Sequence, residues 1–72
     1  MRITTLSEAR SLVGRTFERD GETRSVIDAE QLLWRRGISA VGIGYMKDGA
    51  VRWLQKIDQF SDWLDGATEV TT

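Results

Sequence analysis

Two carboxylates and two guanidinium groups occur within six residues, in the segment Arg19-Asp20-Gly21-Glu22-Thr23-Arg24. Two arginines at this spacing can bind a phosphate or a carboxylate, because a guanidinium donates to two anionic oxygens at once. The same residue types also suit a hairpin turn, since Asp-Gly favours the left-handed backbone that a two-residue turn requires. Exposed cross-strand ion pairs contribute only ~0–1 kcal/mol each. The sequence therefore favours a turn, with anion binding by the arginines as the alternative.

Catalytic and metal-binding chemistry has little support in the residue types. The 72-residue chain contains no histidine and no cysteine, which removes the common general base, the thiol nucleophile and the usual zinc ligands. Asp58, Asp62 and Asp65 recur at helical spacing, but they lack the alternating oxygen ligands of a calcium loop. We therefore expect a protein that is not an enzyme, with no catalytic residue, no cofactor and no metal.

A basic and aromatic surface is the main feature in favour of nucleic-acid binding. Small barrels bind single strands by stacking bases on aromatic rings while cationic side chains follow the phosphates. The residues of this kind are Arg15, Arg19, Arg24, Arg35, Arg36, Arg52, Trp34, Tyr45 and Trp53. The net charge of −1 and the acids between these arginines oppose this function. As the alternative function, the sequence predicts nucleic-acid contacts at Arg15, Arg19, Arg24, Arg52 and Trp53.

Protein–protein interaction is the favoured function. A single domain of this length buries only ~60% of the surface of its unfolded chain, and no disulfide supplements its core. Self-association that covers apolar surface is therefore expected. Trp and Arg dominate protein–protein hot spots, and Trp34, Arg35 and Arg36 are adjacent. These three residues are predicted to contact a protein partner or a second copy of the chain.

Two helices are expected, one near each end of the chain. Thr5-Leu-Ser-Glu8 has the form of a capping box, and a helix over 6–13 would end at Gly14 in the left-handed conformation. A second helix is predicted over 58–66, with Asp58 as its N-cap and Gly66 at its end. Residues 69–71 follow as a short final strand.

Two hairpins are expected between the helices. The first pairs 15–19 with 23–28 around Asp20-Gly21, and the second pairs 38–47 with 50–56 around Asp48-Gly49. A two-residue turn in the second hairpin pairs Lys47 with Ala50 and Gly44 with Trp53. Alternation then puts Val41, Ile43, Tyr45 and Leu54 on one face, and Gly42, Gly44, Met46, Val51 and Trp53 on the other. The segment 28–37 fits a helix and a strand extension with a loop equally well.

Residues 12–26 read Leu-Val-Gly-Arg-Thr-Phe-x-Arg-Asp-Gly-x-Thr-Arg-x-Val, and the chain closes with Phe60-x-x-Trp63-Leu64-x-x-Ala67-x-x-Val70. This order resembles small proteins encoded in phages and bacterial prophages, which are similar to short SH3-like barrels with a C-terminal helix. The pattern departs from them at 29–38. The resemblance implies a phage-derived setting and a binding role, and it assigns no functional residue.

The predicted fold is a single α+β domain over 1–72. Its expected architecture is a curved antiparallel sheet, or a small SH3-like open barrel, of two hairpins with a short N-terminal helix and a C-terminal helix packed on the sheet. The predicted core is Val13, Phe17, Val26 or Ile27, Val41, Ile43, Leu54, Phe60, Trp63 and Leu64. No stretch approaches the ~20 apolar residues of a membrane helix, and no signal-peptide pattern occurs at the N-terminus. A cytoplasmic protein without membrane contact is expected.

Overall fold

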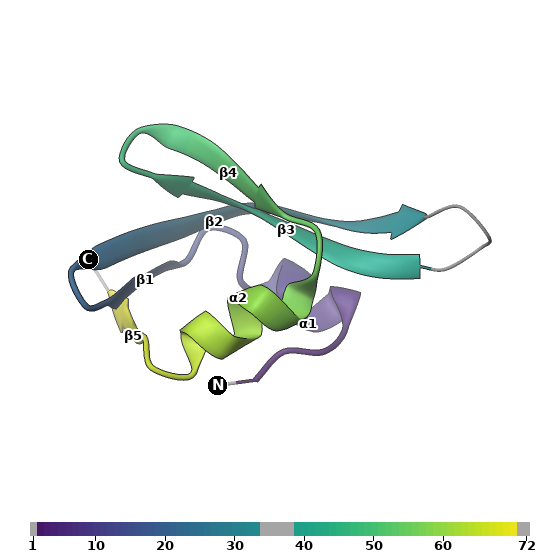
Figure 1. Cartoon of the computed structure of the whole chain (residues 1–72), viewed down its shortest axis with the longest axis horizontal. Coiled ribbons are helices and arrows are strands. Elements are labelled where there is room, and N and C mark those ends of the chain that lie inside the picture. The colour runs from purple at the N-terminus through teal and green to yellow at the C-terminus, as the bar shows by residue number, and fades with distance from the viewer. Residues whose placement is uncertain (1, 34–38, 71–72) are drawn as a thin grey trace.

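The computed structural model describes residues 2–33 and 39–70 as an α+β fold with one open antiparallel sheet (Figure 1). The elements are α1 (Leu6–Ser11), β1 (Thr16–Arg19), β2 (Glu22–Leu33), β3 (Ser39–Lys47), β4 (Ala50–Leu54), α2 (Ile57–Leu64) and β5 (Thr68–Val70). The strand order is β4-β3-β2-β1-β5. The α+β class, the antiparallel sheet and the two helices are confirmed.

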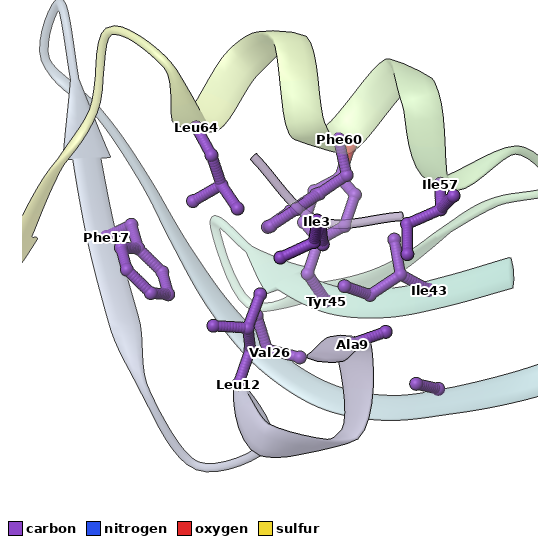
Figure 2. Close-up of a cluster of buried hydrophobic side chains, with 11 residues drawn as sticks. Ile3, Ala9, Leu12, Phe17, Val26, Ile43, Tyr45, Ile57, Phe60 and Leu64 are labelled. Carbon is purple, nitrogen blue, oxygen red and sulfur yellow. The ribbon is translucent and has the colours of Figure 1, made fainter. Parts of the chain in front are cut away.

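Both helices lie on one side of the sheet, which we call the inner face; the other side is the outer face (Figure 1). A single hydrophobic core lies between the helices and the inner face. The close-up in Figure 2 shows Ala9 of α1 and Leu12, which directly follows that helix, together with Ile57, Phe60 and Leu64 of α2. No described helix is long and apolar enough to cross a membrane.

The two Asp-Gly turns determine the registers of both hairpins. Asp20 and Gly21 have φ of 52° and 81°, and Asp48 and Gly49 have φ of 52° and 77°. Positive φ at both central residues is the property of a type I′ turn, whose twist matches that of the flanking strands. Arg19 therefore pairs with Glu22 in the first hairpin. In the second hairpin, the predicted pairs from Lys47–Ala50 to Ile43–Leu54 are all present.

Helix α1 begins with the predicted capping box. The Thr5 hydroxyl accepts from the Glu8 backbone N–H at 3.1 Å, and the Glu8 carboxylate accepts from the Thr5 N–H at 3.1 Å. Gly14 has φ of 89°, which is the predicted left-handed conformation. The helix is shorter than predicted, because Leu12 is its C-cap. Val13 therefore leaves the helical stripe and is 44% exposed, so its predicted place in the core is wrong.

Helix α2 starts one residue earlier than predicted. Lys56 is the N-cap and makes no side-chain capping bond, so the prediction of Asp58 as N-cap is wrong. Ile57 is buried in the core and lies in the first turn of the helix. Asp58 lies in the same turn, where its negative charge interacts favourably with the positive end of the helix dipole. The chain then returns beside β1, where Thr68–Val70 pairs with Thr16–Glu18.

The ambiguous segment 28–37 is a strand as far as it is described. Strand β2 continues to Leu33, because Asp28 to Leu33 pair with Gly44 to Ser39 of β3. A register shift between Val26 and Asp28 inserts Ile27 as a bulge, which bends the strand and increases its twist. Residues 34–38 lie outside the described residues, and the interaction prediction for Trp34, Arg35 and Arg36 falls there.

The observed core contains six residues that the prediction lacked: Ile3, Ala9, Leu12, Ala29, Tyr45 and Ile57. The buried apolar residues are Ile3, Ala9, Leu12, Phe17, Val26, Ala29, Ile43, Tyr45, Ile57, Phe60 and Leu64. Val26, and not Ile27, is the buried residue of that pair. Val41, Leu54 and Trp63 pack against the core while remaining partly exposed.

Candidate interaction surface

The outer face of the sheet carries an uncovered group of apolar side chains. Five residues form this outer-face patch: Ile27, Leu32, Met46, Val51 and Trp53. Ile27, Met46, Val51 and Trp53 are 42%, 37%, 60% and 38% exposed. Large apolar residues gathered on one exposed surface mark interaction sites more often than singly scattered ones do.

Trp53 is the centre of the patch, and two glycines make room for its ring. A Cβ added at Gly44 would lie 2.6 Å from the indole Cε3, and one added at Gly42 would lie 2.9 Å from the indole Nε1. The ring therefore lies directly against the backbone of β3. This close approach accounts for the two glycines on one face of the strand, and it matches the predicted placement of Trp53 opposite Gly44.

Three carboxylates accompany the patch on the outer face. Asp28 and Glu30 are the partners of Gly44 and Gly42 in the β2–β3 ladder, and Glu18 lies on the same face of β1. All three residues are exposed. Among the described strand residues of this face there is no Lys or Arg. The described outer face therefore combines apolar side chains with carboxylates, two of which lie on β2 between Ile27 and Leu32.

Arg24 lies on the inner face inside a group of aromatic rings. Its guanidinium carbon is 4.5 Å from the centroid of the Tyr45 ring and 4.3 Å from that of Trp63, with Phe60 at 5.7 Å. The side chain is only 14% exposed. Its Nε donates to the carboxylate of Glu22. This bond, together with the charges of Arg24 and Lys47, lowers the pKa of Glu22 despite partial desolvation.

Two further arginines hold elements of the fold together. Arg15 forms a bidentate pair with Glu69, with Nε–Oε2 at 2.9 Å and Nη2–Oε1 at 2.6 Å, and this pair ties β5 to the chain before β1. The hydrogen bond from Arg15 lowers the pKa of Glu69. Arg19 donates from Nη1 to the carbonyls of Asp62 and Trp63, both at 3.0 Å, and so stabilises the end of α2.

The residues predicted to contact nucleic acid do not form one surface. Arg24 and Arg52 lie on the inner face, because they pair with Phe17 and Tyr45. Trp53 lies on the outer face. Arg15 and Arg19 donate hydrogen bonds inside the protein, to the Glu69 carboxylate and to the carbonyls at the end of α2. A smaller cationic group does occur on the inner face around Tyr45, where Arg24, Lys47 and Arg52 come from three adjacent strands.

Alternation along the predicted second hairpin already grouped Met46, Val51 and Trp53. The predicted core, with Val41, Ile43 and Leu54, also placed the helices over the other face of that hairpin, and the structure confirms this side. The aromatic surroundings of Arg24 carried no local signal, because they depend on α2 crossing the sheet at Tyr45.

An open hollow of about 490 Å³ lies where the start of α2 meets β3, lined by Thr4, Ala40, Val41, Lys56, Ile57 and Asp58. Its lining has one carboxylate and one ammonium group. Within residues 2–33 and 39–70, no three potential ligands of the His, Cys, Asp and Glu types gather as a metal site would require.

Comparison of the chain with protein-family models, with curated proteins and with solved structures finds no match.

Proposed function

We propose that this protein is a non-enzymatic protein-interaction or assembly module that uses the outer face of its sheet as the contact surface. The observation that carries the proposal is the outer-face patch, with Trp53 seated on Gly42 and Gly44. Because Gly42 and Gly44 lack a Cβ, the indole packs directly against the backbone of β3, and this contact exists without a partner. Aromatic anchors that are already ordered lose little conformational freedom on binding.

The distribution of charge supports a protein partner for this face. Phosphates would meet Glu18, Asp28 and Glu30, since the described part of the face holds no cation. A protein surface that carries both cations and apolar side chains would instead find a partner for the carboxylates and for the apolar patch on this face.

Nucleic-acid binding is the second candidate, and one observation favours it. Arg24, Lys47 and Arg52 gather around Tyr45 on the inner face, where the ring of Trp63 is also partly exposed. Glu22 lies between two of these cations and offsets part of their charge. We therefore rank this function behind protein interaction.

We further propose the setting and the finer fold type that the sequence predicts: a cytoplasmic protein of phage or prophage type, related to small SH3-like barrels. The strand order supports the relation to a barrel, because β1 to β4 form a meander and β5 returns beside β1. The bulge in β2 supports it too, since bulges introduce the curvature that small barrels need.

Site-specific photocrosslinking in the producing cell tests the function. A photoreactive residue at Val51, on the outer face, should give a crosslinked protein that mass spectrometry identifies. The same residue at Gln59, exposed on α2, is the matched control and should give none. Equal crosslinking at both positions, or none at Val51, would contradict the proposal. Crosslinks to nucleic acid from a third position, Arg52, would favour the second candidate.

A further inference from the structure

Among the described strands, β4 is the last at one edge of the sheet, so the side of its backbone away from β3 has no strand partner (Figure 1). The turn before β4 decides which backbone groups point to this side. A two-residue turn makes Lys47 and Ala50 a hydrogen-bonded pair, and such pairs alternate with non-hydrogen-bonded pairs along an antiparallel ladder. The N–H and C=O groups of Val51 and Trp53 therefore point toward the free edge.

The edge at β4 lacks most of the features that prevent pairing with a further strand. Natural sheets protect their edges with proline, with bulges or with very short strands. The chain contains no proline, and β4 pairs with β3 over five residues without a register shift. The opposite edge, β5, has only three residues. The indole of Trp53 also leaves the edge open, because its ring lies over Gly42 and Gly44 of β3.

The side chains along this edge differ between the two faces of the sheet. Val51 and Trp53 belong to the outer-face patch, while Ala50 and Arg52 lie on the inner face, with Lys47 beside Ala50 in the ladder. Arg52 is exposed, and within the described part of the chain no carboxylate pairs with it. A strand added here would place alternate side chains on the two faces. Its outer residues would meet apolar side chains, and its inner residues would meet cations.

We propose that β4 binds, as an added antiparallel strand, an extended segment of a partner protein in which acidic residues alternate with apolar ones. This proposal rests on the proposed function, for which it names the kind of partner. Antiparallel pairing is slightly more stable per residue than parallel pairing. The apolar residues of the segment form hydrogen-bonded pairs with Val51 and Trp53. An acidic residue between them lies opposite Arg52 in a non-hydrogen-bonded pair, where side chains are closest.

A second copy of β4 is the competing occupant of this edge. When two β4 strands pair with their inner faces on the same side, residues of the same face lie opposite each other. In the registers that pair most of β4, Arg52 of one copy lies directly opposite Arg52 of the other or diagonal to it. Like charges at these positions are destabilising. Arg52 therefore opposes pairing between copies and favours an acidic strand, which is how a charge gives specificity.

An amide NMR titration with a short synthetic peptide tests the proposal. The probe is acetyl-Ser-Val-Glu-Val-Glu-Val-Ser-amide, added to millimolar concentration. It should shift the resonances of β4 in a saturable manner. It should also slow amide exchange at Val51 and Trp53, because their N–H groups become hydrogen-bonded. A peptide of the same composition with the two glutamates adjacent loses the alternation and should bind at least about tenfold more weakly.

Two N-methylated forms of the probe test pairing through the backbone. In the proposed arrangement, the N–H groups of the valines point toward β4 and those of the glutamates point away from it. Methylation of the valine nitrogens should therefore abolish binding, and methylation of the glutamate nitrogens should leave it nearly unchanged. Equal binding of the two forms would mean that the peptide does not extend the sheet.

Reversal of one charge tests the choice of an acidic strand. Arg52→Glu should weaken binding of the probe at least about tenfold, and it should favour the peptide in which lysine replaces both glutamates. Gln59→Glu adds negative charge at an exposed position of α2 and is the matched control, which should bind the probe as the wild type does. Amide spectra of both variants should keep the dispersion of the folded wild type.

Several outcomes would overturn the proposal. These are an unchanged spectrum at millimolar peptide, equal binding of the alternating and rearranged peptides, and equal binding of the acidic and lysine peptides to the wild type. Slower exchange at Val51 and Trp53 as the protein alone is concentrated would show that a second copy occupies the edge. A photocrosslink from Val51 to a different protein, found together with failure of the peptide, would leave the proposed function standing without an added strand.

Discussion

The indole of Trp53 occupies the place that a side chain at Gly44 would need. A Cβ on Gly44 would lie 2.6 Å from Cε3 and 2.7 Å from Cζ3 of the ring, and the two residues are direct partners in the β3–β4 ladder. The bare backbone of β3 therefore fixes the orientation of the largest side chain on the outer face. Both the stability of the hairpin and the shape of the proposed interaction surface depend on this contact.

Gly44→Ala should displace the indole and lower the free energy of unfolding by about 1–3 kcal/mol, the usual cost of overpacking. Urea denaturation would give the stability, and tryptophan fluorescence would report the change at the ring. The double variant Gly44→Ala/Trp53→Ala removes the clash, so its loss should be smaller than the sum of the two single losses. Strictly additive losses would mean that the ring does not rest on Gly44.

The second hairpin was predictable from sequence down to its register, because its information is local. Asp48-Gly49 selects a type I′ turn, and with the turn fixed, alternation assigns Tyr45 and Trp53 to opposite faces. The capping box at Thr5 and Glu8 is likewise contained in four residues. Local geometry leaves few alternatives in such segments.

Features that depend on packing across the fold were predicted less well. The start of α2 is set by burial of Ile57 and not by the better capping residue, Asp58. Residues 28–33 have helical preferences, but they are a strand because β3 offers a long partner. The aromatic contacts of Arg24 join residues that are far apart in the chain, so no spacing in the sequence predicts them.

Arg24→Lys should be destabilising although it keeps the charge. An ammonium group is compact and cannot lie against Tyr45 and Trp63 as the planar guanidinium does. Cation–π contacts that are partly desolvated contribute up to ~2 kcal/mol, so we expect a loss of about 1–2 kcal/mol in urea denaturation. Arg52→Lys is the matched control, since Arg52 is exposed on the same face. Equal effects of the two substitutions would rule out a special role for the aromatic contacts.

Ser61→Ala should loosen the N-terminal segment from α2. The Ser61 hydroxyl is fully buried and accepts from the backbone N–H of Ile3 at 3.0 Å. Without it, a buried N–H loses its partner, which costs about 1–3 kcal/mol. Ser7→Ala, at an exposed position of α1, should change stability by less than about 0.5 kcal/mol. Faster amide exchange at Ile3 in the first variant alone would confirm the link, and unchanged exchange there would refute it.

Stability should fall in acid because three glutamates have lowered pKa values in the folded state. The causes are hydrogen bonds from Arg24 to Glu22, from Arg15 to Glu69, and from the Thr4 amide and the Thr5 hydroxyl to Glu8. Each folded pKa lies below the unfolded value of about 4.3. The unfolded chain therefore binds more protons in this range, and stability rises with pH.

This contribution is complete above the unfolded pKa and is lost as pH falls through the folded values. Urea denaturation from pH 7 to pH 3 should show a decline that begins near the unfolded pKa of about 4.3 and continues below it. Glu69→Gln should make the decline shallower, because it removes one of the three groups and its pair with Arg15. Glu30→Gln, which removes an exposed carboxylate of the outer face, is the matched control. If both variants changed the slope equally, the ion pair would not be the source of the acid sensitivity.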